Sequence, residues 1–121
     1  MGDVMFKKVL VIFSMLLLVG CGSIKSGKIS CSDKDVVLDY DNSILIDVRT
    51  DSEYKLGHLD GAINIPYQDI VKGVSKLEDV DFNTNIIVYC KSGGRSSQAF
   101  DSLKNAGYNN IYDLGAMSNC S

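Results

Sequence analysis

Short, mainly apolar runs recur along the chain and are separated by amphipathic stretches. A run that is apolar at consecutive positions is typical of a strand covered on both faces of a parallel sheet. The runs are 28–30, 44–48, 62–65, 86–89 and 111–114. Apolar residues at helical spacing lie between them, at 33–38, 68–77 and 97–106. Strands that alternate with helices predict an α/β fold, with a parallel sheet of about five short strands and helices on both faces.

Residues near the helix ends refine this prediction. Ser32 is the predicted N-cap of helix 33–38. The side chains of that helix expected to face inward are Val36, Val37 and Leu38. Gly107 supplies the predicted end of helix 97–106. The residues expected on its inner face are Ala99, Phe100, Leu103 and Ala106. In the predicted helix 68–77, the apolar residues at helical spacing are Ile70, Val71, Val74 and Leu77.

The composition indicates one globular domain without a cofactor. The chain has 121 residues, of which 45% are apolar, and a single proline. Its formal net charge of −3 at pH 7 predicts no basic face for nucleic acid. No nucleotide-binding glycine pattern and no metal-spaced set of cysteine and histidine residues occurs, so neither a cofactor nor a metal is expected. A monomer is expected.

The first 20 residues are predicted to be a processing segment. Lys7 and Lys8 precede an apolar run of eleven residues, 9–19, and small residues lead to Cys21. This pattern resembles the signal peptide of a bacterial lipoprotein, in which Cys21 would carry the lipid, palmitate included. A short membrane anchor and an ordinary signal peptide are the alternatives, although a spanning helix needs about 20 apolar residues. The resemblance implies a flexible tether at 21–27, a folded domain at 28–121, and anchoring outside the cytoplasm to the cell membrane or the outer membrane.

A cysteine lies at the turn between the strand at 86–89 and the helix that follows. Gly93 and Gly94 allow positive φ, so the amides of 91–96 can curl around Cys90 as an anion-binding nest at a helix N-terminus. The nest and the charges of Lys91 and Arg95 are expected to lower the pKa of the thiol. We therefore predict a reactive cysteine, which requires amides directed at the sulfur and a thiol open to solvent. A buried, inert cysteine is the alternative.

These residues resemble a known family. Residues 90–96 (CKSGGRS) are similar to the active-site loop of single-domain rhodaneses. The family's upstream signature is matched by 45–49 (LIDVR), 53–54 (EY), 57–59 (GHL) and 61–66 (GAINIP). The resemblance covers about 28–115. It implies a rhodanese-like fold and a sulfurtransferase in which Cys90 takes sulfur from thiosulfate or a persulfide, holds it as Cys90–S–SH and passes it to a thiol or cyanide.

The resemblance also implies roles for other residues. The residues expected to bind substrate are Lys91, Ser92, Gly93, Gly94, Arg95 and Ser96. Asp47 and Arg49 are expected to support the loop from below, because a buried carboxylate needs a partner. We expect Arg49 to pair with Glu53, four residues on. His58, the single histidine, is interpreted as structural and not catalytic.

Two other functions remain open. Tyrosine phosphatases and related arsenate reductases use a Cys-x5-Arg loop large enough for a tetrahedral oxyanion, whereas Cys90 and Arg95 give the shorter Cys-x4-Arg. The shorter ring is better suited to a single sulfur atom. A non-catalytic binding module on the same fold is the second alternative, and the presence of Cys90 disfavours it.

Two more cysteines have competing interpretations. The family topology would place the first and last strands side by side, with Cys31 and Cys120 just beyond their carboxyl ends. A Cys31–Cys120 disulfide is one hypothesis, and resolution of oxidised Cys90 by Cys120 is the other. The tail departs from the family, whose members continue through a tryptophan to a closing segment where this sequence has 115–121 (GAMSNCS).

Overall fold

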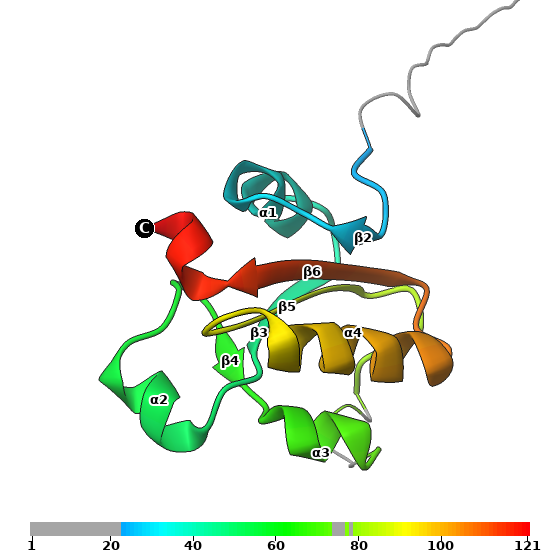
Figure 1. Ribbon diagram of the computed structural model, residues 1–121. Helices are drawn as coiled ribbons and strands as arrows, with labels where there is room; N and C mark the ends of the chain where they lie inside the picture. Colours follow the sequence, from blue (N-terminus) through cyan, green and yellow to red (C-terminus); the bar gives the residue numbers. More distant parts are fainter. Residues whose placement is uncertain (1–22, 74–76, 78) are drawn as a thin grey trace, which may run out of the picture.

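The computed structural model describes residues 23–73, 77 and 79–121, and Figure 1 shows the elements in chain order. The strands are β2 (Gly27–Lys28), β3 (Ser43–Asp47), β4 (Ile63–Asn64), β5 (Asn85–Cys90) and β6 (Asn110–Ala116). The helices are α1 (Cys31–Leu38), α2 (Asp51–Leu56), α3 (Tyr67–Val71) and α4 (Gly94–Asn105), with a 3₁₀ helix, η4, at Met117–Cys120. The predicted leader, including Cys21, lies outside the described residues.

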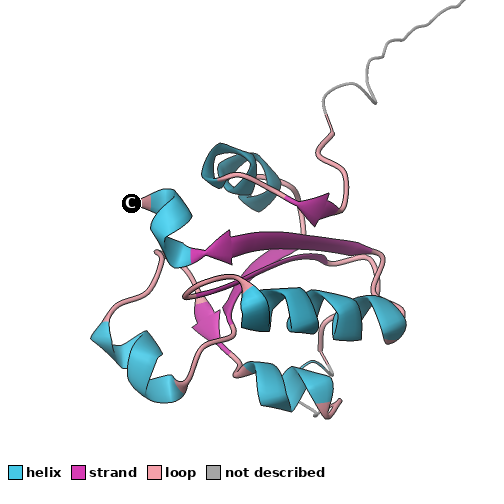
Figure 2. Ribbon diagram, viewed as in Figure 1, coloured by secondary structure: helices cyan, strands magenta, loops and turns pink. Residues whose placement is uncertain are grey.

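The five strands form one parallel sheet, as predicted, and their order is β2-β6-β5-β3-β4. β5 lies at its centre and alternates its side chains between two cores. Val88 and Cys90 pack on the side of α4, whereas Ile87 and Tyr89 pack with residues of α1 and β6 on the other side. Helices therefore cover both faces, as Figure 2 shows. The carboxyl ends of β5 and β3 meet at one edge, which is where parallel sheets place ligand sites.

The helix boundaries correct several expectations. Ser30, not Ser32, caps α1, because its hydroxyl accepts the Asp33 amide while the Asp33 carboxylate accepts the Ser30 amide. Val37 is buried as predicted, but Val36 is 41% exposed. These differences follow from a helix that begins at Cys31, two residues earlier than the predicted start at Asp33.

The helix predicted at 68–77 is shorter than expected. α3 ends at Val71, and Gly73 has a φ of +70°, a left-handed conformation that cannot continue a right-handed helix. Ile70 is buried and Val71 is exposed, whereas Val74 lies outside the described residues. On α4, Ala99 and Leu103 are buried as predicted, but Ala106 is exposed beyond the end of the helix.

A disulfide joins Cys31 at the start of α1 to Cys120 at the end of η4, with their Cα atoms 5.3 Å apart. The structure therefore supports the first of the two cysteine hypotheses. Resolution of Cys90 by Cys120 is wrong for this state, because the Cys120 sulfur is already bonded to Cys31. Within the described residues, Cys90 is the free cysteine. Among the same residues, no helix is both long enough and apolar enough to cross a membrane.

Candidate active site

The loop after β5 encloses the sulfur of Cys90 with backbone amides. Gly93 has a φ of +103°, which favours glycine, and the chain turns there directly into α4 at Gly94. As a result, the amide of Gly93 donates to Sγ at 2.9 Å and the amide of Ser96 donates to it at 3.4 Å. The Ser96 hydroxyl donates to the carbonyl of Gly93 at 3.1 Å and braces the turn. Of the amides of 91–96 that were predicted to surround the sulfur, those of Gly93 and Ser96 donate to it.

The thiol is buried, so the expectation of a thiol open to solvent is wrong for this state. Cys90 is 0% exposed, whereas Lys91, Ser92 and Gly94 above it are exposed. Burial raises the pKa of the Cys90 thiol, but hydrogen bonds from Ser96 and from the amides of Gly93 and Ser92 more than offset it, and the pKa lies below its ordinary value. A cysteine that is buried in purely apolar surroundings has a raised pKa instead. Cys90 is therefore buried but prepared to ionise.

The lowered pKa predicts how Cys90 reacts with iodoacetamide at different pH values. The thiolate is the reactive form, so a lowered pKa shifts the midpoint of the rate to a pH below 9.0, the reference pKa of the thiol. Alkylation of Cys90 in the folded protein, followed by mass spectrometry across the pH range, measures this midpoint. A midpoint at or above 9.0 would contradict the role assigned to the amides.

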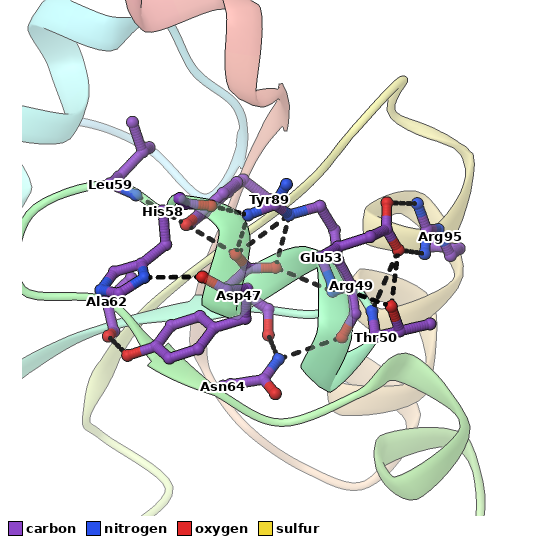
Figure 3. A network of polar contacts seen from close by, with 12 residues as sticks. Asp47, Arg49, Thr50, Glu53, His58, Leu59, Ala62, Asn64, Tyr89 and Arg95 are labelled. Carbon is purple, nitrogen blue, oxygen red and sulfur yellow. Dashed lines mark hydrogen bonds and ion pairs between the residues drawn. The ribbon is translucent and has the colours of Figure 1, made fainter.

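Arg95 pairs with Glu53, the carboxylate that was expected from the sequence to pair with Arg49. Its guanidinium forms a two-point ion pair with Glu53, at 2.6 Å (Nη1–Oε1) and 3.1 Å (Nη2–Oε2). Glu53 also accepts the amide of Thr50, the N-cap of α2. Figure 3 shows the Glu53 carboxylate between Arg95 and Thr50. The ion pair predicted between Arg49 and Glu53 is not formed, and α2 is instead fastened to the active loop through Arg95.

The Arg95 guanidinium, together with hydrogen bonds from Thr50, lowers the pKa of Glu53 to about 2. A carboxyl group with a lowered pKa stabilises the fold above its unfolded pKa, about 4.3, and loses this contribution as the pH falls towards 2. Glu53→Gln is therefore expected to cost about 1 kcal/mol of unfolding free energy near neutral pH and progressively less between about pH 4.5 and 2.

Denaturant titrations at several pH values test this expectation, with Asp60→Asn as the control at an exposed carboxylate. A difference between Glu53→Gln and wild type that stays constant across this pH window would show that the ion pair does not stabilise the loop.

A buried polar network lies below the loop (Figure 3). Asp47 is 0% exposed and accepts three hydrogen bonds from the Arg49 side chain, the shortest at 2.6 Å from Nη2 to Oδ2. The Tyr89 hydroxyl donates to Asp47 at 2.9 Å and accepts the amide of Leu59 at 3.0 Å. Burial raises the pKa of Tyr89 to about 12, so its hydroxyl remains a donor. The network joins β3, β5 and the loop after α2.

Sequence reasoning missed Tyr89 and the role of Glu53. Tyr89 was predicted only as an apolar strand residue, and its position next to Cys90 but on the opposite face of β5 was the available signal.

His58 lies outside the sulfur site: its Nδ1 is 2.9 Å from the Tyr54 carbonyl, and the rings of His58 and Tyr54 stack at 3.8 Å between centroids. No group of three or more potential ligands that could hold a metal ion occurs in the described part of the chain.

The chain resembles known proteins over most of its described length. Residues 32–118 match the family model described as a rhodanese-like domain. The thiosulfate sulfurtransferase 16 of Arabidopsis thaliana is 44% identical over 57% of this chain and 65% of its own length. The thiosulfate sulfurtransferase PspE of Escherichia coli is 35% identical over 60% of this chain and 68% of its own.

Other matches have a different function or a solved structure. A tRNA uridine(34) hydroxylase of Buchnera aphidicola is 36% identical over 71% of this chain. The solved structure described as a rhodanese with anions from E. coli is 33% identical, with a TM-score of 0.57 over 64% of this chain and 89% of its own. The chain spans only 28% of the Buchnera protein, so these names describe proteins that extend beyond the shared region.

Proposed function

This chain belongs to the family of rhodanese-like domains, and on that premise we propose that it is a sulfurtransferase in which Cys90 carries a sulfane sulfur as a persulfide. One observation carries the proposal: the Gly93 and Ser96 amides both donate to the sulfur of a free cysteine with a lowered pKa, at the end of the central strand. Relatives named thiosulfate sulfurtransferase support it. The same amides would stabilise the negative charge of the persulfide.

The reaction has two balanced steps. The Cys90 thiolate attacks the outer sulfur of thiosulfate, the bond between the two donor sulfurs breaks, and sulfite leaves with the electron pair. An acceptor thiolate, R–S⁻, then attacks the outer sulfur of Cys90–S–SH and becomes R–S–SH, while Cys90 returns to the thiolate. A persulfide donor would load Cys90 in the same way, with a thiolate as the leaving group. If cyanide is the acceptor, it attacks the outer sulfur of Cys90–S–SH and is released as thiocyanate.

The buried sulfur adds a step before the chemistry. Cys90 is buried beneath exposed loop residues, namely Lys91, Ser92 and Gly94. A donor must therefore displace part of this short loop to reach Sγ. Lys91 can attract an anionic donor to that point. Arg95 is committed to Glu53 and acts as a positioning residue, since its two-point ion pair fixes the start of α4 beside the sulfur.

Phosphate or arsenate chemistry is the alternative enzyme function. Such a site needs an arginine free to bind a tetrahedral oxyanion, and Arg95 is already paired with Glu53. The test compares three reactions of the same protein: release of sulfite from thiosulfate in the presence of a thiol or cyanide, hydrolysis of para-nitrophenyl phosphate, and reduction of arsenate. We expect sulfite release alone. Turnover of the phosphate ester or arsenate without sulfite release would favour the alternative, and a folded protein inactive in all three would favour a binding module.

We also propose that the domain is exported and anchored to a membrane through lipid at Cys21. The leader-like pattern of 1–20 supports this, and so does the Cys31–Cys120 disulfide, because disulfides persist in oxidising compartments outside the cytoplasm. Labelled palmitate should be incorporated into the full chain and not into Cys21→Ala. Equal labelling of both, or a protein that stays in the cytoplasm, would contradict the proposal.

A further inference from the structure

A cleft opens beside the active loop at the carboxyl edge of the sheet. It is bounded by the end of α2, by Lys91 of the loop and by η4. In Figure 1, α2 and the C-terminal segment that holds η4 lie at the same end of the molecule. The volume of the cleft is about 500 Å³. Pockets of about 300–1,000 Å³ typically hold organic ligands, and thiosulfate, with five heavy atoms, would fill only a small part of this one. We call it the α2–η4 cleft.

Among the charged side chains of the cleft, one cation forms no ion pair with the described residues. Arg49 is neutralised by its ion pair with Asp47, and Glu53 by its ion pair with Arg95. Lys91 is exposed, and within the described residues no ion pair involves it. The cleft therefore favours an occupant with a negative group near Lys91, the residue that follows Cys90 in the loop, which fits a thiolate that approaches the outer sulfur of the persulfide.

The walls of the cleft are partly apolar. Leu56 ends α2 and is 91% exposed, and Met117 begins η4 opposite it and packs against the core. A single exposed leucine is ordinary, but one that lines a cleft together with a methionine and with Lys91 of the active loop offers apolar surface to a ligand. The Cys31–Cys120 disulfide fixes η4 and with it the position of Met117.

From these observations we propose that the α2–η4 cleft receives the sulfur acceptor, and that this acceptor is an organic thiol with an apolar body. Leu56 and Met117 would contact that body, and Lys91 would attract its thiolate. The inference rests on the proposed function and adds the class of acceptor and the residues that select it. In the transfer, the R–S⁻ sulfur bonds to the outer sulfur of Cys90–S–SH, and the Cys90 thiolate leaves.

The test measures how wild type and two variants discriminate between butanethiol and mercaptoethanol, thiols of similar size that differ in an apolar end. The protein is first loaded with thiosulfate, and the rate of sulfur loss from Cys90 is followed by intact mass. We expect wild type to prefer butanethiol, and Leu56→Ser to reduce that preference about fivefold to tenfold, because burial of apolar area against the leucine is lost. Val71→Ser, at a half-exposed valine of α3 outside the cleft, should keep the wild-type ratio.

Met117→Gln provides a second variant on the opposite wall and should reduce the preference in the same direction. A wild-type protein that loads sulfur but shows no preference, or a preference that both variants leave unchanged, would overturn the inference and leave the proposed function intact. If thiosulfate deposits no sulfur on Cys90, the proposed function fails and this inference fails with it.

Discussion

Replacement of Cys90 by serine is expected to reduce sulfite release from thiosulfate by at least about 10³-fold, because the hydroxyl cannot form the persulfide. The fold should change little, since a serine hydroxyl can still accept the amides of Gly93 and Ser96. Steady-state sulfite release measures the activity, and thermal unfolding measures the fold.

The control for this variant removes the two sulfur atoms of the disulfide and keeps that of Cys90. Cys31→Ser with Cys120→Ser deletes the disulfide, which lies outside the nest, and should still gain one sulfur atom on Cys90 from thiosulfate while its stability falls. If the Cys90→Ser protein is folded and retains activity within a factor of about ten of wild type, another group carries the sulfur and the assignment of Cys90 is wrong.

Replacement of Asp47 by alanine is expected to lower the unfolding free energy by about 3–5 kcal/mol. Arg49 is only 7% exposed, and the substitution leaves its guanidinium without a carboxylate partner. It also removes the carboxylate that accepts the hydrogen bond of the Tyr89 hydroxyl. Breaking a buried pair in this way costs far more than removing an exposed one. Denaturant unfolding of the purified variant measures the loss.

Asp51→Ala is the matched control, because Asp51 forms an exposed ion pair with Lys55 on α2 at 3.0 Å. It should cost at most about 1 kcal/mol. If the two substitutions cost the same, the Asp47 network does not hold the loop in place, and the structural support that the sequence predicted for Asp47 and Arg49 would have to be abandoned.

The central part of the fold could be predicted from the sequence because its signals are local. Ile86 to Tyr89 form a continuous apolar run, and the glycines after Cys90 mark the turn into a helix. The burial of Cys90 was not predicted, because its thiol was expected from the sequence to be open to solvent. Ile86, Val88 and Cys90 alternate onto the same face of β5, which packs under α4.

The ion pairs could not be predicted, because they depend on tertiary placement. Arg49 and Glu53 have the i, i+4 spacing of a helical pair, but Arg49 precedes α2, whose N-cap is Thr50, so the spacing rule does not apply to it. Its guanidinium is directed to the buried Asp47 two residues earlier. Glu53 is then available to Arg95, 42 residues away in the sequence.

The C-terminal segment shows the same limit. Nothing in residues 117–120 indicates a helix, and η4 is fixed by contacts from elsewhere: the disulfide to Cys31 and the Asn119 side chain, which donates to the Leu114 carbonyl at 2.9 Å. The sequence left the closure of the site unassigned at this point. In the structure η4 forms one wall of the α2–η4 cleft.

The most direct test of the account is the intact mass of the folded wild-type protein after incubation with thiosulfate, followed by peptide mapping. The account predicts a gain of one sulfur atom, located on the peptide that contains Cys90 and lost again when a thiol is added. A folded protein that gains no sulfur, or that gains it on any residue other than Cys90, would contradict the account.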